Sequence, residues 1–172
     1  MKKILLLFFS LFSMSLFAQN NNTVYHFDYN FTNQIARLWT DFEILVEYDA
    51  LENKILHKDY VFKNGYIFEG ENDSLNEIGF YNDKTLVIDK QSYEMKNPAI
   101  GKIAVRKKGD SKWLPLKQSK ETIVFTENVD DLPEVVKIWA LTAVLQREIS
   151  TREYQMYNRA KVSIGVGVGT SL

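Results

Sequence analysis

The segment from Val135 to Leu145 constrains the fold of this chain more than any other part of its sequence. Only Lys137 and Thr142 interrupt its apolar residues, and Pro133 stands just before it, at a position typical of a helix start. A helix that is apolar almost all round has to be enclosed by other elements. We therefore expect a helix of roughly 12 residues, buried in the core and too short to span a membrane.

The residues before this segment alternate between apolar and polar side chains, which is typical of half-buried strands. The clearest alternation is aromatic, in Tyr25, Phe27, Tyr29 and Phe31. Asn64-Gly65 supplies the two positive φ values that a tight hairpin turn requires. Further strands are expected at residues 77–81, 85–89, 100–106, 113–116 and 122–126.

Two segments are less simple. Residues 42–48 alternate as a strand, but residues 35–45 also fit helical spacing, and the pattern leaves helix and strand open there. At the end of the chain, valine and isoleucine at 162, 164, 166 and 168 alternate with serine and glycine. That pattern predicts a last strand with one bare face, on which another layer could pack.

Together these segments predict a mainly β (α+β) fold. Short strands separated by turn residues every 8–12 positions, roughly, are typical of an antiparallel sandwich or barrel. We expect a single antiparallel β-meander, closed as a barrel or stacked as a sandwich, with one buried apolar helix near the C-terminus.

The first residues have the layout of a bacterial signal peptide. Met1-Lys2-Lys3 is a cationic start, Ile4–Leu16 is apolar apart from serines, and Ala18 is a small residue suited to cleavage. We expect a signal peptide over 1–18, a polar tether over 19–23 and one globular domain over 24–172. The protein is then exported, to a periplasm or the medium. The chain has no cysteine, so its stability has to come from packing rather than from disulfides.

The charges argue against one class of partner and suggest another. The chain carries 21 basic and 22 acidic residues, a balance that speaks against nucleic-acid binding. The second half is the more basic, and its cations gather between positions 102 and 120. The predicted contacts to an anionic surface are Lys102, Arg106, Lys107, Lys108 and Lys112. The alternative is a solvated face whose charges complement the acidic first half.

Both histidines stand two residues before an aspartate, in His26-Phe27-Asp28 and His57-Lys58-Asp59. Residues i and i+2 of a strand share a face, so each pair would set an imidazole beside a carboxylate. Such a pair suits a general base or half of a zinc site. Polar residues on an exposed strand face produce the same spacing. These four residues are the candidate metal ligands, and the sequence predicts no catalytic residue and no cofactor.

The sequence of these strands, followed by an apolar helix, resembles a known family, the tubby-like barrel of the scramblase and LURP-one-related type. In that family, strands wrap a central hydrophobic helix. The resemblance covers roughly residues 66–145. It rests on Asn76-Glu77-Ile78-Gly79-Phe80, Thr85-Leu86-Val87-Ile88-Asp89, Ile100-Gly101-Lys102-Ile103 and the Asp131-Leu132-Pro133 that leads into the helix. The resemblance implies a module that binds lipid or an anionic surface and has no catalytic residues.

We therefore expect an exported, non-enzymatic binding or envelope-associated module. Its partner would be a protein or another envelope ligand, with a peripheral contact to an anionic membrane and no transmembrane helix. The alternatives are a small secreted metal-dependent hydrolase that uses the His/Asp pairs, and an interaction protein that docks by its C-terminal strand.

Overall fold

A computed structural model describes residues 23–41, 43–70, 74–96 and 102–166, with the backbone alone described over 161–166. The helix of this part is α2 (Glu134–Val166). The strands are β1 (Val24–Asn30), β2 (Ile35–Trp39), β3 (Ile44–Asp49), β4 (Lys54–Leu56), β5 (Tyr60–Lys63), β6 (Tyr66–Glu69), β7 (Asn76–Tyr81), β8 (Thr85–Ile88), β9 (Gln91–Lys96), β10 (Ala104–Lys107), β11 (Leu114–Ser119) and β12 (Thr122–Phe125).

The strands form a closed antiparallel barrel in which each pairs with its neighbours in the sequence and β1 pairs with β12. The predicted mainly β meander is therefore confirmed, and of the two predicted arrangements, barrel and sandwich, the structure is a barrel. Closure gives every strand two partners, which leaves no unpaired sheet edge. The Asn64-Gly65 hairpin is also confirmed, with φ values of 55° and 84° between β5 and β6.

Alternation of the side chains points one face of each strand into the barrel. In β1 the buried residues are Tyr25, Phe27 and Tyr29, as the aromatic alternation predicts, while Phe31 lies in the turn beyond the strand. Residues 35–39 and 44–49 are strands, which settles the ambiguity over 35–45. Two strands, β4 and β9, were not among those expected.

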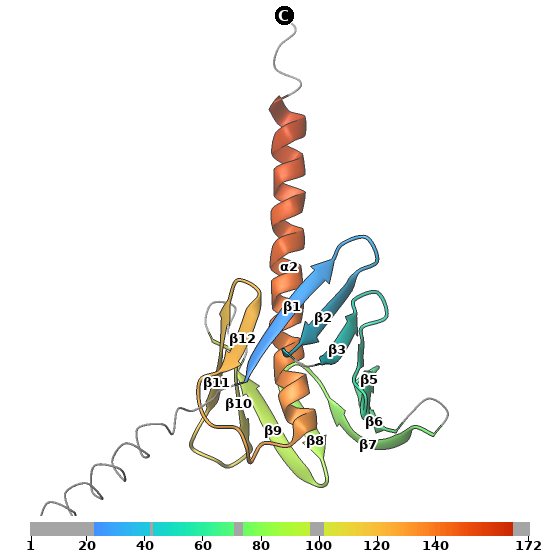
Figure 1. Cartoon of the computed structure of the whole chain (residues 1–172), viewed down its shortest axis with the longest axis vertical. Helices are drawn as coiled ribbons and strands as arrows, with labels where there is room; N and C mark the ends of the chain where they lie inside the picture. The colour runs from blue at the N-terminus through green and yellow to red at the C-terminus, as the bar shows by residue number, and fades with distance from the viewer. Residues whose placement is uncertain (1–22, 42, 71–73, 97–101, 167–172) are drawn as a thin grey trace, which may run out of the picture.

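Helix α2 runs along the inside of the barrel (Figure 1). Residues Val135, Val136, Ile138, Leu141, Val144 and Leu145 are all at most 2% exposed. The indole N–H of Trp139 donates to the backbone oxygen of Asn82 at 3.2 Å, so its polar atom is satisfied at the wall. The predicted enclosure is confirmed, since every residue from Val135 to Leu145 except Lys137 is buried.

The helix is longer than its apolar segment predicts, and this corrects the expected C-terminal strand. It continues without a break to Val166, so the alternating residues 162–166 have a helical backbone, and residues 167–172 lie outside the described part. The residues from 146 to 156 are mostly good helix formers without glycine or proline, so nothing ends the helix there. An alternating pattern of valine and glycine did not outweigh this continuation.

The barrel has two ends that differ in their relation to α2. The chain leaves β12 at one end, where residues 126–133 lead into the helix, and we call this the helix-start end. At the opposite end, the helix-exit end, α2 leaves the barrel and projects beyond it (Figure 1). Because the strands alternate in direction, the described turns at the helix-exit end are residues 31–34, 50–53, 64–65, 82–84 and 120–121.

Over the ranges described above, no helix has an apolar stretch long enough to cross a membrane.

Replacing Leu141 by alanine tests the enclosure of the helix. Leu141 is 2% exposed, so we expect Leu141→Ala to lower the free energy of unfolding by about 2–5 kcal/mol through lost burial and a cavity. Tyr154→Ala on the same helix is the matched control, since Tyr154 is 68% exposed and should change stability by less than about 0.5 kcal/mol. Chemical denaturation measures both. Equal effects of the two changes would contradict the described packing.

Candidate functional site

The first histidine pair lies on the outer face of β1, near the helix-start end. The imidazole Nε2 of His26 is 3.6 Å from an Asp41 carboxylate oxygen, and its ring stacks on Trp39 at 6.1 Å. Asp28 shares the outer face of the strand but lies opposite Arg37 of β2. The structure therefore gives His26 a different carboxylate partner from the one that its sequence spacing predicts.

The second pair lies in the turn between β4 and β5. His57 is buried, and its Nδ1 accepts a hydrogen bond from the backbone N–H of Asp59 at 3.1 Å. Its ring stacks on Tyr60 at 5.6 Å. Burial lowers the pKa of His57, and the carboxylate of Asp59, 3.9 Å away, opposes this only in part. Nδ1 can accept that hydrogen bond only in the neutral imidazole, so the geometry agrees with the lowered pKa.

The two histidine pairs do not form one site. Within the described segments, no group of three or more histidine, aspartate or glutamate side chains is placed to hold a metal ion. Four ligands of the kind that zinc accepts are therefore not assembled from His26, Asp28, His57 and Asp59. His57 sits buried in the β4–β5 turn, hydrogen-bonded to the backbone of Asp59 and stacked on Tyr60.

The predicted cationic stretch is divided between the two ends of the barrel. Lys102 lies at the helix-exit end, whereas Lys107, Lys108 and Lys112 lie around the β10–β11 turn at the helix-start end. Ile103 and Val105, between these cations in the sequence, are buried. Residues that are neighbours in the sequence are thus separated by the length of β10.

Arg106 is tied into the barrel wall. Its guanidinium donates two hydrogen bonds to Glu94, at 2.8 and 3.0 Å, and one to the backbone oxygen of Asp110 at 3.0 Å. It also lies over the ring of Trp113, 4.3 Å from the centroid. Nearby, Lys112 pairs with Glu127 at 3.0 Å. Two of the five predicted anion contacts therefore already have partners within the chain.

A second group of cations surrounds a depression at the helix-exit end, which we call the exit pocket. Its volume is about 400 Å³, and it is lined by Lys102, Leu116, Lys117, Gln118, Lys120 and Arg147. The lysines come from the barrel wall and its turns, and Arg147 comes from α2 where the helix reaches the rim. Leu116 is 2% exposed and supplies an apolar floor.

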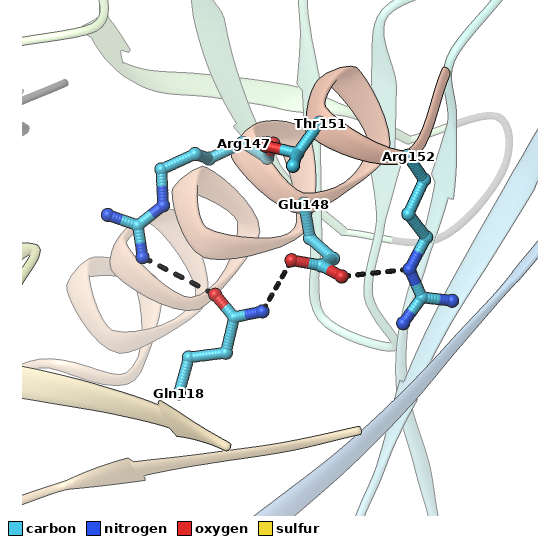
Figure 2. Close-up of polar contacts among 5 residues, drawn as sticks. All are labelled: Gln118, Arg147, Glu148, Thr151 and Arg152. Atoms are coloured by element: carbon cyan, nitrogen blue, oxygen red, sulfur yellow. Dashed lines mark hydrogen bonds and ion pairs between the residues drawn. The ribbon is translucent and has the colours of Figure 1, made fainter. Parts of the chain in front are cut away.

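A hydrogen-bond network fixes the helix at this rim (Figure 2). The Arg147 guanidinium donates to the Gln118 side-chain oxygen at 3.3 Å, and the Gln118 amide donates to Glu148 at 2.6 Å. Glu148 in turn accepts from Arg152 at 2.8 Å. The network joins β11 to α2 and engages the Glu148 carboxylate beside the exit pocket.

A second polar contact holds the helix one turn further out. The hydroxyl of Tyr29 donates to Glu153 at 2.9 Å. Burial of the phenol, together with this bond to a carboxylate, raises the pKa of Tyr29 to about 12. The base of the projecting helix is therefore anchored to both β1 and β11.

Exposed apolar side chains also gather at the helix-exit end. Ten large apolar residues are exposed in the described part of the chain. Only three belong to the helix-start end, namely Val24, Ile44 and Leu75. The other seven lie on the turns and strand ends of the helix-exit end or on the projecting helix: Phe31, Leu51, Tyr66, Phe80, Tyr154, Met156 and Tyr157.

Sequence patterns missed this surface for a definite reason. Phe31 and Leu51 each sit beside turn residues, a signal that they fall outside the buried faces, but nothing in their spacing tells which turns share an end. Lys117 and Lys120 belong to the cationic stretch, yet they were not among its predicted contacts. Arg147 lies far away in sequence and joins them only through the fold.

Comparison with protein-family models, with curated proteins and with solved structures finds no match to this chain. Its class is therefore defined by its architecture, an antiparallel barrel closed around a helix.

The buried His57 predicts a dependence of stability on pH. Because its pKa is lowered in the folded state, the unfolded chain takes up a proton first as the pH falls through about 6.5. The stability that the neutral ring contributes is thus complete above that pH and is lost below it. We expect His57→Gln, which keeps a side-chain acceptor but cannot titrate, to flatten the fall in melting temperature between about pH 7 and pH 5.

The matched control is His26→Gln, at a more exposed histidine with a side chain 35% accessible. This variant keeps His57, so the fall in melting temperature that His57 causes should persist in it. If the two variants show the same pH profile, His57 is not the titrating group.

Proposed function

We propose that this protein is an exported, non-enzymatic, envelope-associated module that docks on an anionic membrane surface by its helix-exit end. One observation carries the proposal: seven of the ten exposed large apolar side chains lie at this end or on the helix that projects from it. Clusters of exposed apolar groups on a folded protein are typical of interaction surfaces.

The chemistry of these side chains favours a lipid surface. Tyrosine is enriched where proteins meet the headgroup layer of a membrane, because its ring is apolar and its hydroxyl polar. Tyr154 and Tyr157 project on α2, and Tyr66 stands on the rim, all of them about half exposed or more. The cations of the exit pocket lie at the same end of the barrel. Each lysine or arginine near an acidic membrane contributes about 1 kcal/mol of attraction.

The opposite end is unsuited to the same surface. Its turns are acidic on balance, so an anionic bilayer would repel them. In the described turns of this end the acidic residues are Asp41, Glu43, Asp59, Asp89, Asp110, Glu127, Asp130 and Asp131, against Lys58, Lys90, Lys108 and Lys112. This asymmetry supports an end-on orientation, with the helix-exit end toward the lipid.

The packed interior supports a binding role at the surface. The apolar residues of α2 from Val135 to Leu145 belong to the core inside the barrel, so a ligand meets the ends and the outer wall. The resemblance to the tubby-like barrel implies the same kind of role, a lipid- or anionic-surface-binding module, and we propose it on that ground as well.

Export is the part of the proposal that rests on the leader. Cleavage after Ala18 would remove about 2 kDa, as expected for a signal peptide of this length. Mass spectrometry of the native protein should therefore give a mature N-terminus at or near Gln19. Detection of Met1 in the mature protein would contradict export by cleavage.

Docking is tested with vesicles that contain phosphatidylglycerol. We expect Leu51→Ser combined with Tyr154→Ser to weaken co-sedimentation about tenfold, since each lost apolar contact is worth about 1 kcal/mol or more. Raising the salt should weaken binding further by screening the cations. Ile44→Ser is the matched control: Ile44 is 66% exposed and Leu51 71%, but Ile44 lies at the helix-start end. Its binding should not change.

Two outcomes would contradict membrane docking. The first is an absence of vesicle binding at low salt. The second is that Ile44→Ser weakens vesicle binding as much as the Leu51/Tyr154 variant does, which would mean that lipid binds exposed apolar groups at both ends of the barrel. In either case the helix-exit end would be left as a surface for a protein partner.

A further inference from the structure

We infer that the exit pocket is a binding site for a phosphate group, a step that rests on the proposed membrane docking and names the chemistry recognised there. Four cationic side chains, Lys102, Lys117, Lys120 and Arg147, line a depression of about 400 Å³. None of the described residues that line it is acidic. The four cations come from three segments that meet only in the folded barrel: Lys102 precedes β10, Lys117 and Lys120 belong to the β11–β12 hairpin, and Arg147 belongs to α2.

Two carboxylates stand near this cationic lining: Glu121 follows Lys120 in the β11–β12 turn, and Glu148 belongs to the rim network. The nearest carboxylate of the rim network, Glu148, accepts hydrogen bonds from Gln118 and from Arg152. Both oxygens of the Glu148 carboxylate thus accept a hydrogen bond, one of them from the Arg152 guanidinium (Figure 2). Gln118 orients its oxygen toward Arg147 and its amide toward Glu148. An incoming anion therefore meets lysine ammonium groups and a guanidinium, with a carboxylate already held by other donors.

The number of cations indicates the class of anion. A single carboxylate carries one negative charge and is matched by one arginine or lysine. Three lysines and an arginine around one depression match an anion of two or more charges, and lysine binds phosphate as a compact point charge. Phosphate is therefore the group we assign, whether it arrives on a lipid headgroup or on a soluble molecule.

The turn that carries Lys120 makes a sharp test available. Lys120 has a φ of 47°, a left-handed conformation that costs a lysine free energy and suits glycine. Lys120→Gly removes the cation while relaxing the backbone. A purely structural role predicts an unchanged or higher melting temperature and no effect on anions. A phosphate site predicts the same stability with weaker anion binding.

The first experiment uses inorganic pyrophosphate and isothermal titration calorimetry on the mature protein. We expect Lys117→Gln combined with Lys120→Gly to weaken pyrophosphate binding at least tenfold without lowering the melting temperature. The matched control is Lys107→Gln combined with Lys108→Gln, which removes two exposed lysines at the helix-start end. This control should bind pyrophosphate as the unchanged protein does. Equal losses in both variants, or no pyrophosphate binding, would overturn the site.

The second experiment identifies where the phosphate comes from. Vesicles of phosphatidic acid, a phosphate monoester, are compared with phosphatidylglycerol vesicles at equal surface charge. Preference for phosphatidic acid that disappears in the Lys117/Lys120 variant supports the site with a lipid source. Pyrophosphate binding without that preference supports the site with a soluble source.

The outcomes for the site and for the proposed function are distinguishable. In one outcome, vesicle binding depends on Leu51 and Tyr154, while the changes at Lys117 and Lys120 affect neither vesicle binding nor pyrophosphate binding. The phosphate site is then overturned and membrane docking stands. If pyrophosphate binding depends on the lysines while no vesicle binds, the phosphate site stands and membrane docking is overturned.

Discussion

The enclosure of an apolar helix by the barrel is the constraint on which the rest of this structure depends. From Val135 to Leu145 every residue except Lys137 is buried, and burial of that much apolar surface is a main source of stability in a domain without disulfides. The strands in turn need the helix, because a twelve-strand barrel is too wide for its own side chains to fill. Helix and barrel are therefore stable only together.

This mutual dependence also creates the candidate surface. A helix longer than the barrel has to leave it, and the polar residues that follow the apolar segment meet the rim there. The network of Gln118, Arg147 and Glu148, with Tyr29 and Glu153 beyond it, holds the helix at its exit. The same passage sets Arg147 beside Lys102, Lys117 and Lys120. Structural anchoring and the cationic pocket thus share side chains.

The two ends of the barrel differ both in charge and in the number of exposed apolar side chains. The helix-start end carries most of the acidic turn residues, and the helix-exit end carries most of the exposed apolar ones. In an up-and-down barrel, alternate turns lie at alternate ends. Acidic residues on every second turn of the sequence therefore gather at one end of the barrel, and exposed apolar residues on the other turns gather at the opposite end. An oriented docking module needs such a difference between its two ends.

Sequence alone determined the elements whose signal is local. The period-two aromatics of β1, the Asn64-Gly65 turn and the apolar segment of α2 follow from side-chain alternation, backbone φ and burial, each read within a few residues. The pairing of His26 with Asp41, the division of the stretch from Lys102 to Lys112 and the exit pocket were decided by the tertiary structure. Barrel closure and the path of the helix bring distant residues together, and no short-range pattern encodes which distant residues will meet.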